Sequence, residues 1–573
     1  ELDYTLPFFP DLKIVTNLGI DASKSKIEER FSENAVQTYR FNQGTDIDTN
    51  FVFNPGVNYR EDQTITNTTF DLYTQYRKEF DAGFLNNFDV QVGYSYQNFK
   101  TDGNKQIFNY NIDTGLREET INQDNLNNRY FNEYNLQSFF ARSNINLNNK
   151  YLLTFSVRAD ASSLFVSDDI WDSKVWGFFP AAALAWKVKE ESFLKDVSSV
   201  NDLKIRLGVG KTGQNDITGA VGFYPSTPFF QAGNANSQYF PNSSLYAALP
   251  FNPNLTWEKT TTYNAGIDFS LFKNEFINGA FDVYRRETTD LLSRTPVPPG
   301  QGLTNSFIDN IGSSESKGLE LSLNLRPIVT ENVELSFSGN VGYNKTEITD
   351  LEGADLLEAG GNLRGTGTNL LYNKVGLQAG SAWVLKQVYD TSGNPIPGAF
   401  VDLNGDNVID NDDRYFEQIA PNWTYGFGFN FNYKNWDLSS GFRGQVGGHV
   451  YNQTKLNFGF TESAIPQNAS SLTNVLNFYT GAANPAFTDY SNENVVFSDF
   501  FLEDATFLRC DNITLGKRFD NMIKDASIRF YASVSNAFII TDYSGQDPEN
   551  FGGIDGSFYP RPRSFTFGLN LDF

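Results

Sequence analysis

The chain ends in RSFTFGLNLDF (residues 563–573), where every second residue is large and apolar. These apolar residues are Phe565, Phe567, Leu569, Leu571 and Phe573. Because successive side chains of a strand point to opposite faces, the segment has one apolar and one polar face. Strands of soluble proteins usually have about five or six residues, whereas strands that cross a membrane have about nine to eleven with this alternation. The segment therefore predicts a membrane-spanning strand.

The same alternation recurs along the chain and marks about sixteen candidate strands, a number typical of outer-membrane barrels. Clear examples are residues 87–99, 318–325 and 424–433. The sequence therefore predicts an all-β fold, a transmembrane antiparallel β-barrel. In such a barrel the polar residues of each strand face the lumen. We expect this of Asp89, Gln91, Asn430, Asn432 and Asn570.

Short and long connections alternate between the predicted strands. The short links are residues 148–150, 272–275, 326–330 and 434–435, and the long polar segments are 212–258, 289–317, 347–422 and 447–504. Outer-membrane barrels have short periplasmic turns and longer extracellular loops, so the long segments are predicted to be extracellular. Residues 190–202 form the one rather long periplasmic connection. The aromatic-rich residues 214–251 would either stack on sugars or pack against each other, and packing is favoured.

Composition excludes several classes of protein. Mean hydropathy is −0.40, and no run of about eighteen apolar residues exists, which argues against transmembrane helices. The net charge of −24 argues against binding of nucleic acid, because few cations are available to neutralise phosphates. A single His and a single Cys rule out a His-based triad, a zinc spacing and an internal disulfide. We predict no catalytic residues and interpret the chain as a non-enzyme.

Residues 397–415 contain one motif with metal-ligand spacing, DLNGDNVIDNDD at 402–413. Calcium loops of this spacing bind through side-chain oxygens and one backbone carbonyl. The ligands would be Asp402, Asn404, Asp406, Asp413 and the carbonyl of Val408. The motif departs from the usual pattern by Asn407 at its sixth position, although Asn tolerates the left-handed conformation needed there, and by Asp at its twelfth. The prediction is a calcium-binding loop insert, and the alternative is an acidic surface turn without an ion.

Eight segments of the sequence resemble segments of a known protein family. They are YLLTFSVRADASSLF (151–165), GFFPAAALAWKVKEESFLK (177–195), LKIRLGVGKTGQNDI (203–217), NPNLTWEKTTTYNAGIDFSLF (252–272), NIGSSESKGLELSLN (310–324), VDLNGDNVIDNDDR (401–414), FLRCDNITLGKRF (507–519) and SFYPRPRSFTFGLNLDF (557–573). In this order, and over nearly the whole chain, the protein resembles the barrel of SusC-like TonB-dependent outer-membrane transporters of Bacteroidetes.

The resemblance implies a larger barrel than this sequence provides. Transporters of this kind have about 22 strands around a plug, whereas this chain has about sixteen candidate strands and no recognisable plug. We therefore interpret residues 1–573 as the barrel domain, truncated on its N-terminal side, with the plug and the TonB-contacting region outside this sequence. The resemblance also implies that the terminal aromatic strand, residues 565–573, is the membrane-insertion signal.

The function implied by the resemblance is TonB-dependent nutrient uptake across the bacterial outer membrane. The expected partners are a SusD-like surface lipoprotein that caps the loops, a TonB complex, outer-membrane lipid, and an oligosaccharide or oligopeptide as substrate. A dimer of transporter–lid pairs is also implied, and Ca²⁺ is the one expected cofactor. No substrate-binding residue can be named from the sequence. Two alternatives stay open, a scaffold subunit of a larger outer-membrane complex and a passive porin without a plug.

Overall fold

The structure is a computed structural model that describes most of the chain. The described residues are 1–31, 39–41, 51–53, 56–80, 83–111, 116–120, 128–169, 171–215, 223–228, 230–232, 246–248, 251–296, 306–363, 369–458, 493–523, 526–550, 552–556 and 560–572.

Within these residues the main feature is an antiparallel sheet of 18 strands. Sixteen of them have nine or more residues: β2 (Phe9–Phe31), β5 (Gly56–Glu79), β6 (Leu85–Asn111), β8 (Arg129–Leu147), β9 (Tyr151–Ser162), β10 (Trp176–Lys187), β11 (Val200–Gln214), β14 (Glu258–Leu271), β15 (Ile277–Thr289), β18 (Ser313–Val329), β19 (Val333–Asp350), β26 (Trp423–Tyr433), β27 (Trp436–Val446), β30 (Phe507–Ile523), β31 (Ala526–Thr541) and β32 (Ser564–Asp572). The short strands β1 (Leu2–Leu6) and β7 (Leu116–Thr120) pair with β2 and β6. The prediction of about sixteen strands in an all-β fold is confirmed.

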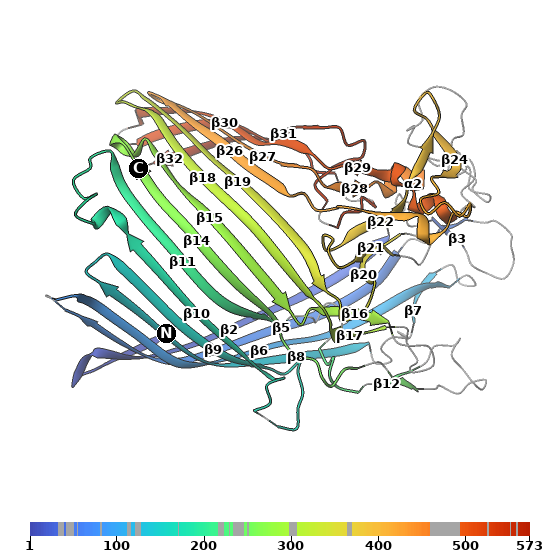
Figure 1. Cartoon of the computed structure of the whole chain (residues 1–573), viewed down its shortest axis with the longest axis horizontal. Helices are drawn as coiled ribbons and strands as arrows, with labels where there is room; N and C mark the ends of the chain where they lie inside the picture. Colours follow the sequence, from blue (N-terminus) through green and yellow to red (C-terminus); the bar gives the residue numbers. More distant parts are fainter. Residues whose placement is uncertain are drawn as a thin grey trace.

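Each long strand pairs with the next long strand along the chain, from β2 to β32. The strands β2, β5 and β6 slope in the opposite direction to β14, β15 and β18 (Figure 1). Opposite slopes are what the two walls of a curled sheet show, because tilted strands wrap around the axis of a barrel. Figure 1 therefore shows a sheet that curls around an interior.

The connections alternate between the two ends of the strands, as predicted. Tight turns lie at one end, on the left in Figure 1, and long loops lie at the other. Asn148 and Asn149 join β8 to β9 with φ of 52° and 56°. Positive φ at both central residues is the requirement of a tight hairpin turn, and Asn tolerates it better than most residues. The predicted link at 326–330 lies later in the structure, because β18 continues to Val329 and its turn is residues 330–332.

The longer connection between β10 and β11 is held by Glu191. Its carboxylate accepts hydrogen bonds from Lys150 Nζ at 2.8 Å, Tyr151 Oη at 2.8 Å and Trp186 Nε1 at 3.1 Å. The ammonium of Lys150, with the two neutral donors, stabilises the charged carboxylate and lowers the pKa of Glu191 to about 2. The predicted periplasmic connection at 190–202 therefore has a charged anchor to the β8–β9 turn.

The two faces of the sheet differ in chemistry. In β26 and β27, Phe427 pairs with Phe442 across the strands, and Gly426 pairs with Arg443 on the other face. In β32, Phe567 is 82% exposed and shares its face with Phe565, Leu569 and Leu571. Exposed aromatic side chains in a continuous band are typical of a lipid-facing surface. The apolar face is therefore the outer face, and the polar face lines the lumen.

The long loops contain secondary structure of their own. Strands β20 (Leu357–Asn362), β21 (Asn369–Asn373), β22 (Ser381–Leu385) and β25 (Arg414–Glu417) form a four-stranded sheet. Among the described residues, five two-stranded sheets pair β3 (Tyr39–Phe41) with β4 (Phe51–Phe53), β12 (Phe230–Ala232) with β13 (Tyr246–Ala248), β16 (Leu292–Pro296) with β17 (Ser306–Asn310), β23 (Gln387–Tyr389) with β24 (Pro395–Phe400), and β28 (His449–Tyr451) with β29 (Leu502–Asp504). The helices are η2 (Val188–Glu190), η4 (Lys273–Glu275), η5 (Asn411–Asp413), α2 (Gln453–Phe458), η6 (Glu493–Phe497) and η7 (Asp499–Phe501). Among the described residues, none of the helices has the length and apolar composition needed to cross a bilayer.

Three loops form a folded unit at the loop end of the strands, which we call the loop cap. It comprises the described residues of the loops after β19, β27 and β31. Its core includes Leu385 and Tyr451, which are fully buried, and Ile554 packs against it. Apolar residues of these three loops therefore pack against each other. The aromatic-rich residues 214–251 lie largely outside the described residues.

Candidate functional site: the lumen wall and the loop cap

The lumen wall carries polar side chains at the positions predicted from alternation. Asp89 and Gln91 lie on β6, Asn430 and Asn432 on β26, and Asn570 on β32, each on the face opposite to the aromatic band. Asp89 accepts a hydrogen bond from Gln75 Nε2 at 2.7 Å. The structure therefore distributes the five predicted lumen residues over three distant strands, and they do not form one site.

An ion network lies on the lumen side of β11, β14 and β15. Arg206 donates to Asp268 and to Asp282, both at 2.8 Å, and Lys204 lies 2.7 Å from Asp268. A side chain at Gly266 would collide with Arg206 and Asp282, so glycine makes room for the network. Because two cations face two carboxylates, this part of the wall is charged but close to neutral overall. Sequence reasoning did not identify it, because its members lie 62 and 76 residues apart.

A groove of about 480 Å³ lies on the lumen side of β18, β19, β26, β27 and β30. Its lumen-facing residues are small or carry amides and hydroxyls: Asn324, Ser338, Asn340, Gly426, Gly428, Asn430, Ser439, Gly441 and Asn512. Within the described residues, the side-chain amides of Asn340, Asn430 and Asn512 form no hydrogen bond. No charged residue lines the groove. An amide can both donate and accept, so this wall can hold an uncharged polar solute or water.

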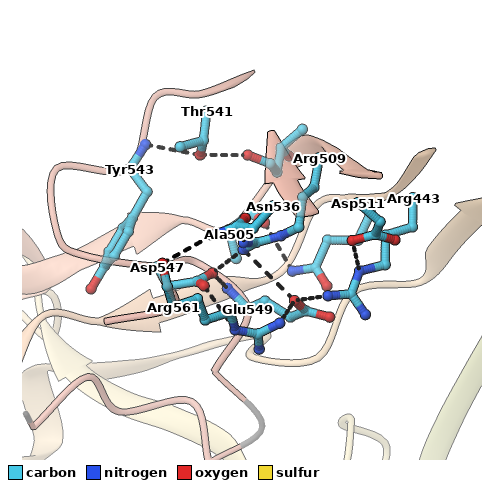
Figure 2. Close-up of polar contacts among 12 residues, drawn as sticks. Arg443, Ala505, Arg509, Asp511, Asn536, Thr541, Tyr543, Asp547, Glu549 and Arg561 are labelled. Carbon is cyan, nitrogen blue, oxygen red and sulfur yellow. Dashed lines mark hydrogen bonds and ion pairs between the residues drawn. The ribbon is translucent and has the colours of Figure 1, made fainter. Parts of the chain in front are cut away.

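A charged cluster joins the barrel wall to the loop after β31 (Figure 2). Its members are Arg443, Arg509, Arg561, Asp511, Asp547 and Glu549. Arg509 on β30 donates to Asp547 at 2.6 Å, and these two side chains are only 3% and 5% exposed. Arg561 binds the other Asp547 oxygen at 3.1 Å and Glu549 at 2.8 Å. The buried charges compensate each other, as burial of ions requires, and they fix the loop against the wall.

The same loop continues into the loop cap. Tyr543 donates a hydrogen bond to Asp555 Oδ2 at 2.8 Å, and burial together with this carboxylate raises the pKa of Tyr543. The amide of Asp555 donates to the carbonyl of Tyr451 at 2.8 Å, and the amide of Thr454 donates to the carbonyl of Asp555 at 3.0 Å. The loop after β31 therefore connects the charged cluster on the barrel wall to the core of the loop cap.

The predicted calcium loop lies in the loop cap, between β24 and β25. The amides of Gly405 and Asn407 donate to Asp402 at 2.6 and 2.8 Å, and the amide of Leu403 donates to Asp413 at 2.7 Å. Asn407 has φ of 67°, so the left-handed conformation expected of the sixth position is confirmed. Burial raises the pKa of Asp413, but its hydrogen bonds from backbone amides outweigh burial and leave the pKa lowered.

The donor set of this loop has the chemistry that calcium prefers. Asn404 accepts from the amide of Asp406 at 2.9 Å, and Asp406 accepts from the amide of Val408 at 2.7 Å. In the part of the chain that the structure describes, no group of three or more His, Cys, Asp or Glu side chains has the geometry to hold a metal ion. The ligand assignment to Asp402, Asn404, Asp406, Val408 and Asp413 therefore stays a prediction.

The predicted insertion signal is only partly described. Phe565, Phe567, Leu569 and Leu571 lie on the outer face of β32 and are exposed. Phe573 lies outside the described residues. The strand that carries these residues is confirmed, whereas its role in membrane insertion stays a prediction.

The chain belongs to the family described as TonB dependent receptor-like, beta-barrel, whose model matches residues 15–383. Barrels of this family lie in the outer membrane, and the long loops of this chain are accordingly extracellular. The chain is SusC-like: it is 37% identical, over all of its length, to the TonB-dependent receptor SusC of Bacteroides thetaiotaomicron. It is 30% identical over 90% of its length to the TonB-dependent receptor P3 of Formosa agariphila. The chain spans about half of these relatives, 55% and 53% of their lengths.

A solved structure shows the same fold. The structure of the RagAB peptide transporter matches with a TM-score of 0.76 at 20% sequence identity, over 99% of this chain and 60% of that chain. The RagAB peptide importer in its "open-open" state matches with a TM-score of 0.71 at 21% identity. These matches place the open, curled sheet within a barrel architecture.

Proposed function

We propose that this chain is the barrel of a TonB-dependent importer that takes a polar oligomeric nutrient, an oligosaccharide or an oligopeptide, across the outer membrane. The observation that carries the proposal is the 37% identity over the whole chain to the TonB-dependent receptor SusC. A polar lumen wall inside an apolar outer face supports transport of a polar solute. The uncharged groove around Asn340, Asn430 and Asn512 is the part of the wall that such a solute would contact.

The importer would work with partners on both sides of the membrane. A SusD-like lipoprotein would sit on the extracellular loop cap, and a TonB complex would act through a region outside residues 1–573. RagAB, whose barrel has the same fold, is a peptide importer, which supports the peptide class of substrate for a related barrel. We expect pairs of barrel and lid, associated as dimers, and we interpret residues 1–573 as one barrel domain of a longer protein.

Uptake in cells that carry the full-length gene tests the proposal. Labelled oligosaccharides and oligopeptides should enter wild-type cells, and uptake should stop when the gene is deleted or a protonophore removes the inner-membrane energy supply. Asn430→Trp fills the lumen groove, whereas the neighbouring Phe429→Trp changes the lipid face of the same strand and is the matched control. Uptake should fall in the first variant and persist in the second.

The rival functions predict different results in the same system. A passive porin would keep its uptake after protonophore treatment and would conduct ions in planar bilayers. A scaffold subunit would copurify with several unrelated envelope proteins, and its deletion would change assembly without changing uptake of any labelled oligomer. Either result would refute import as the function of this barrel.

We also propose that residues 397–415 bind Ca²⁺ and that the ion orders this part of the loop cap. Support comes from the spacing of the oxygen ligands and from the left-handed Asn407. Chelation should increase protease cleavage near Asp402, and Asp402→Asn should reproduce this effect without chelator. Asp390→Asn is the matched control, because Asp390 also accepts backbone amides in a turn of the same loop but lies outside the motif. Equal cleavage with and without chelator would remove the metal assignment.

A further inference from the structure

One face of the four-stranded sheet in the loop cap carries aromatic side chains beside a cation. Trp383 on β22 pairs in register with Phe416 on β25, and the two rings lie nearly parallel, with centroids 6.0 Å apart and an interplanar angle of 11°. Tyr372 on β21 meets the ring of Trp383 edge-on, with centroids 5.3 Å apart. Arg414 lies two residues before Phe416 on β25 and therefore shares its face. This sheet lies at the loop end of the barrel, which is its extracellular end (Figure 1).

The guanidinium of Arg414 lies against aromatic rings from two different loops. Its Cζ atom is 4.9 Å from the centroid of the Trp383 ring and 3.6 Å from that of Phe497 in η6. Trp383 belongs to the loop after β19, whereas Phe497 belongs to the loop after β27. Contacts of a cation with ring faces hold the guanidinium in place but use none of its N–H donors. Arg414 is thus fixed in position with its hydrogen-bonding capacity unspent.

Arg414 has no counter-ion among the described residues. Its side chain forms no hydrogen bond or ion pair with any of them, and its Nε atom is buried without a partner. The adjacent Asp413 accepts backbone amides of the calcium motif, and Glu358 on β20 accepts a hydrogen bond from Asn369. Burial lowers the pKa of Arg414, as expected of a cation without a compensating carboxylate. A partly buried charge of this kind is costly unless an anion pairs with it.

A second cation lies on the same pair of rings. The Nζ atom of Lys374, directly after β21, is 5.1 Å from the centroid of the Phe416 ring. Lys374 is exposed, and it forms no ion pair within the part of the chain that the structure describes. The chain as a whole has a net charge of −24, so two cations without carboxylate partners on one aromatic pair are a local excess of positive charge. Such an excess attracts an anionic ligand.

We propose that this face of the loop cap binds an acidic oligosaccharide, with the carboxylate of a sugar acid on Arg414 and a second acidic group of the chain near Lys374. The proposal rests on the proposed function and narrows the cargo to a carboxylate-bearing sugar oligomer. Arginine suits a carboxylate because its planar guanidinium donates two parallel hydrogen bonds.

Two observations favour a sugar over a peptide as the acidic ligand. The rings of Trp383, Phe416 and Tyr372 offer a flat apolar surface beside the cation, which suits the apolar face of a sugar ring. The groove in the lumen wall is lined by amides and hydroxyls without a charged residue, which suits the hydroxyl groups of the same oligomer.

Equilibrium binding to the purified full-length protein in detergent tests this site. The probes are short oligomers of galacturonic acid and of mannuronic acid, each compared with its fully methyl-esterified form, which keeps the sugar chain and removes the charge. Isothermal titration calorimetry should show that wild type binds at least one of the acidic oligomers at least about tenfold more tightly than its ester. Arg414→Gln should abolish this preference. Lys374→Gln should reduce it about two- to fivefold, as expected of an exposed charge.

The control variant separates this site from a general affinity for anions. Lys386→Gln removes another exposed cation of the same loop, which contacts none of these rings, and this variant should bind as wild type does. Protease resistance of the loop cap is measured for every variant, and Arg414→Gln should keep it, because no hydrogen bond or ion pair to a described residue is lost.

Several results would overturn the proposal. They are equal affinity for acid and ester in both sugar series, unchanged binding by Arg414→Gln, an equal loss in Lys386→Gln, or tighter binding of a short glutamate peptide than of either acidic oligosaccharide. The measurement needs no energy supply. Loss of the energised uptake would therefore refute import without affecting this result, and absence of binding would refute this site without affecting import.

Discussion

The buried pair of Arg509 and Asp547 gives the sharpest prediction about the loop cap. Asp547→Asn keeps the shape of the side chain but removes the charge that compensates the buried guanidinium. Breaking a buried ion pair by removing one partner typically costs about 3–5 kcal/mol. We expect the lower end, about 3 kcal/mol, because Glu549 lies 3.7 Å from Arg509 and stays in place.

The stability lost in Asp547→Asn should appear as more frequent local opening of the loop after β31. Since about 1.4 kcal/mol is tenfold in an equilibrium constant, a loss of about 3 kcal/mol raises the population of the open loop about 100-fold. Hydrogen–deuterium exchange is the assay. The amides of Asp555 and Thr454, whose hydrogen bonds join the loop after β31 to the segment that follows β27, should lose protection by this factor. Amides in the centre of β30 and β31 should exchange as before.

A matched substitution controls for the loss of a carboxylate. Asp511→Asn removes the same charge from the same cluster, but Asp511 is 38% exposed and its partner Arg443 is 41% exposed. Exposed pairs contribute about 0–1 kcal/mol, so exchange should rise less than about fivefold. The reasoning is refuted when Asp547→Asn changes protection by less than about threefold, or when both variants have equal effects.

Four further outcomes are expected. The pKa of Glu191 is lowered from 4.5 to about 2, so its anchor to Lys150 stabilises the fold fully above about pH 4.5 and is lost as the pH falls toward 2. Melting temperatures of wild type should therefore fall in this window more than those of Glu191→Gln. Phe567→Arg should cost about 2–4 kcal/mol of barrel stability in lipid. If the terminal strand directs membrane insertion, a charged residue in place of Phe573 should lower the amount of protein at the cell surface. Normal surface levels of that variant would contradict this role. Leu385→Ala should destabilise the loop cap by about 2–5 kcal/mol, measured by protease cleavage within the cap while the barrel stays resistant.

Most of the barrel follows from local patterns in the sequence. The alternation in residues 424–433 places Phe427 on one face and Asn430 on the other, and the structure has β26 over Trp423–Tyr433 with these faces. Turn positions follow for a similar reason, because Asn148 and Asn149 supply the positive φ that the turn between β8 and β9 requires. The calcium motif could be located from its spacing, but spacing alone does not decide whether an ion binds.

The sequence by itself determined the strands, the two faces of each strand, the side on which long loops lie and the family, because each of these depends on residues that are near neighbours along the chain. Only the tertiary structure decided the rest. The charged cluster joins Arg443 to Glu549, 106 residues apart, and the loop cap joins Gln387 to Ser498, 111 residues apart. Contacts of this kind leave no periodic signal, because the pairing of distant segments, and not the order of residues within one segment, brings the side chains together.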